Sequence, residues 1–207
     1  LSYWSAKGFS PDAMADFASL RGPVGMNRVY VRSGAPLEYR RWLDSLKAGR
    51  SFATNGPLLE FSMGGRGAGQ ELHLAAGAHA VTARISLRSN VPIDHLEIVG
   101  NGEVVRTIPL GGERKAAALS VELPVSRSGW YLLRARSDHA IYPVLDLYPY
   151  ATTSPVYVSV GAQRARSPED ARYFAAWIDR VIETTAKYPD WNSDAEKQGV
   201  LDRLRQA

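Results

Sequence analysis

The segment HAVTARISLR, residues 79–88, decides the fold of this protein. Its apolar side chains fall at every second position, at Val81, Ala83, Ile85 and Leu87. Polar or charged residues fill the positions between them. Successive side chains of a β-strand point to opposite faces, so this period of two predicts a strand with one face in a core and the other in water.

A hairpin is predicted further along the chain, in LEIVGNGEVVRTI, residues 96–108. Two apolar runs flank Asn101-Gly102, the pair that best tolerates the positive φ angles of a type I′ turn. Further strand patterns follow in residues 119–123, 130–136 and 155–160. About seven to nine short strands within roughly 100 residues are typical of an antiparallel β-sandwich of immunoglobulin-like type.

Helical patterns flank this predicted sandwich. Before it, a helix is predicted over residues 10–23, a strand over 27–32, and a second helix over 36–48 with Gly49 as its C-terminal glycine. After it, Ser167 is placed to cap a helix that runs to about residue 190, and a last helix is predicted over 193–205. The predicted fold class is therefore α+β.

Composition limits the partners and the chemistry. The chain has 207 residues, of which 45% are hydrophobic and 22% charged, and its longest apolar runs are too short for a membrane helix. Its net charge of +4 is scattered rather than gathered in a basic stripe. Cysteine is absent, which excludes disulfides and thiolate chemistry. We therefore expect neither nucleic acid nor a membrane as a partner, while the localisation stays open.

Few residues are arranged for catalysis. The four histidines lack the spacing that places two imidazoles on one face of an element, and the glycine-rich GGRGAG at 64–69 is predicted to be a loop between strands. Asp12 and Asp16 lie four apart in a predicted helix, so both face one side. The two carboxylates are interpreted either as metal ligands or as a helix-capping acid and a solvated side chain.

The stretch IYPVLDLYPYATTSPVY, residues 141–157, is rich in aromatic side chains. Tyr142, Tyr148 and Tyr150 offer flat apolar faces with polar tips, as a sugar-binding platform requires. Sandwich edges and loops use tyrosines structurally as well. The sequence leaves both interpretations open.

Three ordered stretches together resemble the C-terminal half of the CehA/McbA-family metallohydrolases, in the polymerase-and-histidinol-phosphatase (PHP) superfamily. They are DAMADFASLRGPVGMNRVYV, WLDSLKAGRSFATNGPLLEFSMGGRGAG, and LEIVGNGEVV together with ATTSPVYV. The resemblance covers roughly residues 3–160. It implies that residues 1–57 are the last elements of a PHP-type α/β barrel, that 58–161 form a β-sandwich accessory domain, and that 162–207 are C-terminal helices.

The same resemblance implies candidate site residues. The family's late Gly-Thr-Asp-Ala motif corresponds to residues 10–13, which makes Asp12 the candidate metal ligand and Asp16 the second choice. Arg28 and Arg50 become candidates for binding an anionic substrate. Residues 51–54 become a late barrel strand. Thr54 and Asn55 then lie where the barrel meets the sandwich, either as site residues or as a hinge, and the hinge is favoured.

The resemblance also implies an activity that this chain does not carry by itself. In the intact parent a divalent metal (zinc, manganese or iron) would activate water to hydrolyse an ester, amide or phosphoester of a small-molecule substrate. The early His-x-His ligands are absent here, so we expect the chain alone to be inactive. It begins without Met, and we expect it to be a soluble processed product or the tail of a longer protein. The localisation is left open, with a secreted or periplasmic parent among the alternatives.

Two further expectations accompany this hypothesis. An incomplete barrel predicts exposed apolar surface around Trp42 and Trp177, and hence a homo-oligomer or packing of the C-terminal helices over that surface. The alternative is a stand-alone β-sandwich module that binds carbohydrate or a protein surface through its tyrosines.

Overall fold

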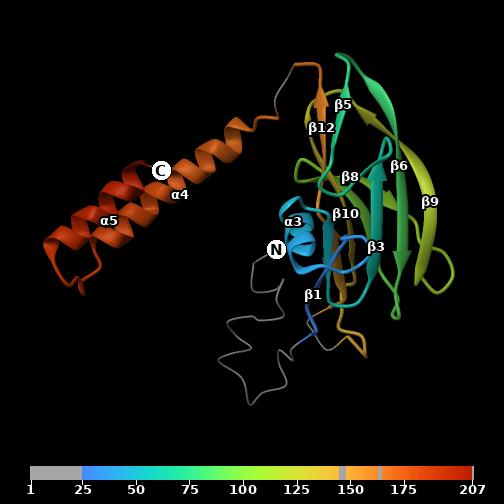
Figure 1. The fold of residues 1–207 in the computed structure, drawn as a ribbon, viewed down its shortest axis with the longest axis horizontal. Coiled ribbons are helices and arrows are strands. Elements are labelled where there is room, and N and C mark those ends of the chain that lie inside the picture. Colours follow the sequence, from blue (N-terminus) through green and yellow to red (C-terminus); the bar gives the residue numbers. More distant parts are fainter. Residues whose placement is uncertain (1–24, 145–147, 163–164, 207) are drawn as a thin grey trace. The chain divides into compact units, whose positions relative to one another are not determined.

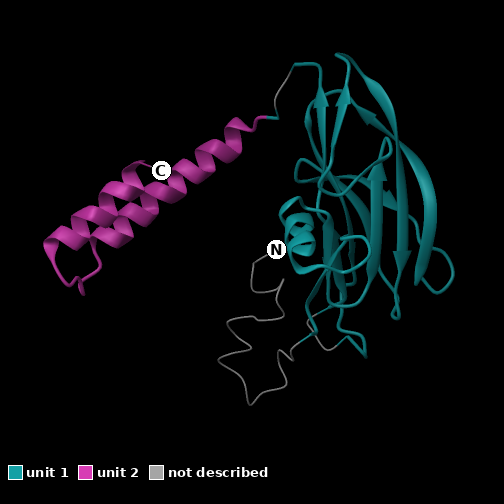
Figure 2. Ribbon diagram, viewed as in Figure 1, with its two compact units in different colours: residues 1–165 teal, residues 166–207 magenta. Residues whose placement is uncertain are grey.

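The computed structural model describes residues 25–144, 148–162 and 165–206 (Figure 1). It divides into two compact units, residues 1–165 and 166–207 (Figure 2). The helix expected over residues 10–23, with Asp12 and Asp16, lies outside the described residues. Each unit is therefore considered by itself.

The elements of the first unit follow one another as β1 (Arg28–Val31), α3 (Tyr39–Lys47), β2 (Ser51–Thr54), β3 (Leu58–Met63), β4 (Arg66–Gly67), β5 (Glu71–Leu74), β6 (His79–Arg88), β7 (His95–Gly100), β8 (Glu103–Ile108), β9 (Ala116–Val125), β10 (Gly129–Arg136), β11 (Tyr150–Thr153) and β12 (Val156–Val160). The second unit contains α4 (Pro168–Ala186) and α5 (Asp194–Gln206). The fold is thus α+β, as predicted, with most strands in antiparallel sheets.

The strands form two sheets. The smaller sheet has the order β4-β3-β6-β9. In the larger, eight-stranded sheet, β10 pairs with β7 along one edge and with β11 and β12 along the other. β7 continues to β8, β11 to β2 and β1, and β12 to β5. This arrangement is compatible with a β-sandwich.

One core joins the inner faces of the two sheets. The alternation in β6 is confirmed, because Val81, Ala83, Ile85 and Leu87 are all at most 5% exposed. They share a hydrophobic cluster with side chains of the larger sheet such as Ile98 and Leu133. Burying one large apolar side chain contributes about 1.5–3 kcal/mol, so this shared core is the main source of stability.

The predicted hairpin is also confirmed. Asn101 and Gly102 have φ angles of 51° and 93°, and β7 and β8 pair directly beside them, with Gly100 opposite Glu103. The Asn101 side chain accepts a hydrogen bond from the backbone N–H of Trp130 at 3.0 Å. The turn is therefore tied to the start of β10 as well as to its own strands.

Two features differ from the prediction. β5 runs parallel to β12, whereas only antiparallel pairs were expected. The chain leaves the smaller sheet after β4 and enters the larger one at β5, so β5 is free to run in the direction of its new neighbour instead of folding back as a hairpin. The described residues between 58 and 160 also contain ten strands, including the two-residue β4, instead of seven to nine.

The segment before the sandwich is continuous with the larger sheet. β2 pairs with β1 on one side and with β11 on the other, both antiparallel. In the chain, α3 lies between β1 and β2 and ends at Lys47. Gly49 follows two residues later with a φ of 69°, as predicted for the glycine after the helix. No break between compact units falls near residue 57. The assignment of residues 1–57 to a barrel stays a prediction.

The second unit is a pair of helices. The predicted cap of α4 is confirmed, since the Ser167 hydroxyl accepts a hydrogen bond from the Asp170 N–H at 3.1 Å and Pro168 occupies the first turn. α5 packs against α4 (Figure 2). None of the helices in the described part of the chain is long and apolar enough to cross a membrane.

Alanine substitutions at Gly69 and Gly65 test the close contact between the end of α3 and the loop before β5. A Cβ at Gly69 would overlap the carbonyl oxygen of Ala48 and lie 2.6 Å from the Gly49 carbonyl carbon, whereas a Cβ at Gly65 meets open space. Their φ angles are nearly equal, at 77° and 79°. Gly65→Ala should therefore cost only the left-handed backbone penalty, about 1–2 kcal/mol. Gly69→Ala should destabilise by at least about 1–3 kcal/mol more, because of the overlap.

Urea denaturation of the two variants measures this difference. Equal destabilisation by the two substitutions would contradict the close contact between the end of α3 and the loop at Gly69.

Candidate functional site

The turn Thr54-Asn55-Gly56-Pro57 carries the chain from the larger sheet to the smaller one. Thr54 ends β2 and is 4% exposed. Its hydroxyl donates a hydrogen bond to the Pro57 carbonyl and accepts one from the Gly56 N–H at 2.8 Å. The Thr54 side chain thus stabilises the turn by hydrogen bonds to the turn's own backbone.

Asn55 links the turn to the segment that leads into β11. Its side-chain N–H donates to the Tyr148 carbonyl at 2.7 Å, and its side-chain oxygen accepts from the Tyr150 N–H at 2.7 Å. Its own backbone N–H donates to the Tyr150 carbonyl at 3.0 Å. Asn55 is 8% exposed, so these bonds lie away from water. The amide side chain extends the pairing of β2 with β11 by one residue.

This geometry is what a rigid connection requires. The side-chain oxygens and nitrogen of Thr54 and Asn55 are held by backbone groups within the unit. A catalytic role for either residue would need those atoms to turn toward a substrate. The hydrogen bonds show a connection held by its own side chains, and the hinge and catalytic interpretations both stay predictions.

The two candidate arginines are not brought together. Arg28 begins β1 opposite Thr54, next to the turn. Arg50 precedes β2 at the other end of the same ladder, where its carbonyl accepts from the Arg32 N–H. Four residues of strand separate these ends, which is about 13 Å. The two side chains therefore do not form one anion-binding pair at the Thr54 turn.

The predicted tyrosine platform lies beside the same turn. Tyr142 is 83% exposed and Tyr148 is 40% exposed. The Tyr148 and Tyr150 rings meet edge to face, with centroids 6.2 Å apart. Asn55 bonds to the backbone of both Tyr148 and Tyr150, so these two tyrosines are attached directly to the turn.

The sequence did not reveal a charged network on β7 and β10. The Arg134 guanidinium donates two hydrogen bonds to Glu97 Oε2, at 2.7 and 3.0 Å, and the Glu97 side chain is only 8% exposed. Arg136 and His95 both contact the carboxylate of Asp138, at 2.8 and 2.9 Å. The alternating charges of DHLE and RARSD are visible in the sequence, but their pairing depends on the strand register.

These contacts affect the ionisation of Asp138. The hydrogen bond from His95 is the main cause that holds the pKa of Asp138 below its usual range, and Arg136 adds to the effect. At the other end of β10, burial raises the pKa of the Tyr131 hydroxyl. Folding therefore favours the carboxylate form of Asp138 over its protonated form.

The remaining histidines make local contacts. His73 bonds the Ser159 hydroxyl at 2.7 Å, and His79 bonds the Ala75 carbonyl at 2.8 Å. Within residues 25–144, 148–162 and 165–206, no three His, Asp or Glu side chains are grouped to hold a metal ion. Asp12 and Asp16 lie outside these ranges.

Comparisons with protein-family models, with curated proteins and with solved structures give no match for this chain.

The hydrogen bonds of Asn55 predict a large effect on stability. Asn55→Ala removes both side-chain bonds and leaves the Tyr148 carbonyl and Tyr150 N–H without them, so unfolding should become about 2–4 kcal/mol easier. Asn90→Ala, at an exposed bend after β6 in the same unit, should change stability by less than about 0.5 kcal/mol. Urea denaturation followed by tyrosine and tryptophan fluorescence measures both. Equal changes in the free energy of unfolding for the two variants would show that the Asn55 side-chain hydrogen bonds do not stabilise the fold.

The lowered pKa of Asp138 predicts a pH-dependent contribution. The folded state binds this proton less readily than the unfolded chain, so the stabilisation is present above the ordinary Asp pKa of about 4 and is lost as the pH falls through the lower pKa of the folded state. Asp138→Asn should therefore be less stable than the wild type at pH 7, and this difference should shrink as the pH falls below about 4. Urea midpoints measured from pH 7 down to about pH 2 provide the measurement. The exposed Asp179→Asn serves as control, and a difference that does not shrink in acid would refute the explanation.

Proposed function

We propose that this chain is the C-terminal portion of a PHP-type metal-dependent hydrolase, and that it is not catalytically competent alone. In the intact parent, metal-activated water would hydrolyse an ester, amide or phosphoester. The two-sheet region would be an immunoglobulin-like accessory domain, with residues 1–57 as the last elements of the barrel. The three ordered sequence stretches described above support this assignment.

One structural observation carries the proposal. The strand–helix–strand segment β1–α3–β2 lies at one edge of the larger sheet and contributes little to the core cluster, which is built from residues 59–160 with Phe52 packed against it. β1 is nevertheless hydrogen-bonded onto β2 at the edge of the larger sheet. Such an appended layer is expected where an α/β domain passes its chain to an accessory sandwich.

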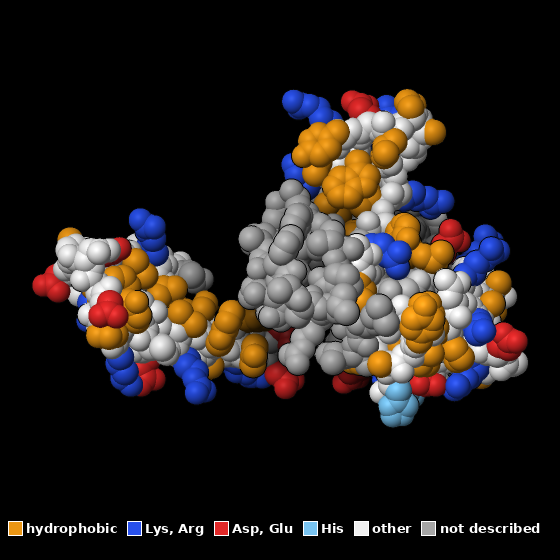
Figure 3. Space-filling model, turned by 90° about the horizontal axis from the view of Figure 1, so that it is seen from below, with side chains coloured by type: hydrophobic (Ala, Val, Ile, Leu, Met, Phe, Trp, Pro, Cys, Tyr) orange, Lys and Arg blue, Asp and Glu red, His pale blue; other side chains and the backbone are white. Residues whose placement is uncertain are grey.

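The surface of this layer is apolar where a neighbouring domain would lie. Leu37 and Tyr39 are 77% and 73% exposed, and Tyr30, stacked on Phe52 at 5.0 Å, is 42% exposed. Trp42 is half-buried. Patches of hydrophobic side chains are visible on this unit in Figure 3. Exposed apolar clusters of this kind mark interaction sites, so the layer is a suitable docking face for the rest of a barrel.

The described residues do not themselves supply a metal site, so no hydrolytic step is derived from them. In the proposed parent Asp12 would be a late metal ligand, with Asp16 as second choice. Arg28, beside the Thr54 turn, is better placed than Arg50 to meet a substrate bound there. This preference for Arg28 over Arg50 rests only on the pairing of β1 with β2.

A second candidate function is a β-sandwich module that binds carbohydrate. The high exposure of Tyr142 and the edge-to-face pair of Tyr148 and Tyr150 favour it. Retention of the chain on immobilised polysaccharide, lost in Tyr148→Ala, would support this candidate over the hydrolase.

Metal analysis tests the leading proposal. The purified chain is dialysed with zinc or manganese, freed of excess metal, and analysed by mass spectrometry of the elements. We expect well below one metal ion per chain and no hydrolysis of nitrophenyl esters or phosphates, because one or two carboxylates do not hold a catalytic metal. Stoichiometric metal in this chain would contradict the proposal.

A longer parent protein provides the complementary test, in which metal binding is expected. If the coding sequence upstream adds a His-x-His strand, the longer protein should bind metal, and Asp12→Ala should lower its metal content at least about tenfold. Asp44→Ala, in the exposed part of α3, is the matched control. A longer protein whose metal content does not respond to Asp12→Ala would remove Asp12 from the site.

A further inference from the structure

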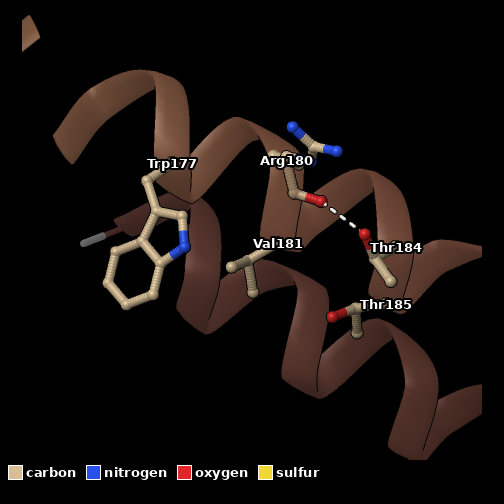
Figure 4. Close-up of a pocket in the computed structure, with 5 residues that line it drawn as sticks. All are labelled: Trp177, Arg180, Val181, Thr184 and Thr185. Atoms are coloured by element: carbon tan, nitrogen blue, oxygen red, sulfur yellow. Dashed lines mark hydrogen bonds between the residues drawn. The ribbon is translucent and has the colours of Figure 1, made fainter. Parts of the chain in front are cut away.

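The exposed side of α4 carries the apolar surface that was expected around Trp177. The Trp177 side chain is 56% exposed, beside a shallow hollow that is lined by Arg180, Val181, Thr184 and Thr185 (Figure 4). The side chains around this hollow do not select one occupant. The edge of the smaller sheet is more specific, because its backbone groups restrict what can bind there.

Among the described residues, β9 is the longest strand at an edge of either sheet. It runs from Ala116 to Val125 and pairs only with β6, in a continuous register of ten residues without a bulge (Figure 1). Five of its first seven residues are exposed, namely Ala116, Ala118, Leu119, Ser120 and Glu122. An exposed edge strand offers unpaired backbone groups to a further strand.

The backbone groups of β9 alternate between its two sides. The Lys115 carbonyl accepts a hydrogen bond from the Ser89 N–H at the end of β6, so the odd-numbered residues bond to β6. The Glu122 carbonyl accepts from Arg106 of β8, at 3.4 Å, so the even-numbered residues face outward. Pro124 agrees, because an edge strand tolerates proline where the missing N–H would face away from the ladder. Outward-facing N–H groups therefore belong to Ala116, Ala118, Ser120 and Glu122.

The other edges of the two sheets carry features that hinder further pairing. β1, β4 and β5 have four residues or fewer. β8 has an irregular register opposite Ile98 and Val99, and its Arg106 crosses to the other sheet. Short strands, bulges and inward-pointing charges are common protections of an edge. Residues 116–121 of β9 contain neither a charged residue, nor a proline, nor a bulge.

We propose that β9 pairs with β9 of a second copy of this chain, antiparallel about a twofold axis at Leu119. Ala118 then faces the partner's Ser120, and Ala116 faces the partner's Glu122. Each facing pair exchanges two backbone hydrogen bonds. The Glu122 carbonyl has a second lone pair, so its bond from Arg106 does not prevent this exchange. The contact is isologous, because both copies use the same strand.

Apolar side chains favour this register. The two copies of Leu119 face each other across the axis in a non-hydrogen-bonded pair, where opposite side chains approach most closely. Leu119 is 36% exposed in the single chain, so the pairing covers it. Ala117 then faces the partner's Val121, which places a small side chain against a larger one. The pairing ends before Pro124, which has no N–H to donate.

Charge complementarity is a second reason for choosing a copy of this chain as the partner. Arg88 of β6 lies opposite Ala116 on the outer face of the smaller sheet. The partner's Glu122 would lie beyond Ala116 in the same row, about 10 Å from Arg88 between Cα atoms. The small Ala116 leaves room for the two charged side chains to meet. Among the described residues neither has an ion-pair partner, and the Glu122 carboxylate accepts only from the neutral Thr82 hydroxyl.

Sedimentation equilibrium of the full chain over about 10–1,000 μM tests the dimer. One strand from each copy makes a small interface, so we expect a dissociation constant on the order of 100 μM. Leu119→Lys places two ammonium groups opposite each other at the axis and should raise this constant about 10-fold or more. Val104→Lys, at a 46% exposed position of the edge strand β8, is the matched control and should leave it within about twofold.

An exchange of charges tests the register. Arg88→Glu and Glu122→Arg each bring like charges together, so each variant alone should dimerise about 5-fold or more weakly than the wild type. An equal mixture of the two variants should form heterodimers within about threefold of the wild-type affinity, because opposite charges then meet at both ends. Arg84→Glu, on the same face of β6 but opposite Ser120, is the control and should have little effect.

The absence of cysteine allows a covalent test as well. At the twofold axis the Cα atoms of the two copies of Leu119 would be about 4.5 Å apart, which a disulfide can span. Leu119→Cys should therefore form a linked dimer under mild oxidation. Ala117→Cys faces the partner's Val121 instead of itself, and should link at least about tenfold more slowly.

Three results would overturn the proposal. A strict monomer at about 1,000 μM, ten times the expected dissociation constant, removes the second copy and leaves the edge to a strand of another protein. A dimer that neither Leu119→Lys nor the charge variants weaken uses another surface. Linkage of Ala117→Cys as fast as that of Leu119→Cys shows a different register.

Discussion

The Asn55 side chain holds the turn between the two sheets in place, and the packing of the first unit depends on that turn. By bonding the backbone at Tyr148 and Tyr150, it holds together segments that lie more than 90 residues apart. At this point the chain crosses from the larger sheet to the smaller one. If the crossing slipped by one residue, every side chain of the following strand would change face, because strands alternate with a period of two. The shared core therefore needs this turn in one conformation.

The same turn connects the structure with the proposed function. On one side of it lies β1–α3–β2, with exposed apolar side chains at Leu37 and Tyr39, and on the other lies the two-sheet core. A rigid crossing would transmit the position of one domain to the other. If the proposed function is correct, the Thr54 turn would have a structural role between the accessory region and the rest of the parent protein.

The two units are stabilised in different ways. The first unit has a core shared by two sheets. It also has an ion pair between Glu97 of β7 and Arg134 of β10. The second has one buried side chain within its two helices, that of Leu201. A helix pair with so little burial is marginal in water.

Sequence alone determined the features that depend on local geometry. The alternation of residues 79–88, the Asn101-Gly102 turn and the Ser167 cap each result from backbone preferences within a few residues. Only the tertiary structure decided the partners of Asn55, the parallel pairing of β5 with β12, the ladder that separates Arg28 from Arg50, and the pairing of Arg134 with Glu97. These contacts join distant segments, and their register is set by packing two sheets over one core, which no local pattern encodes.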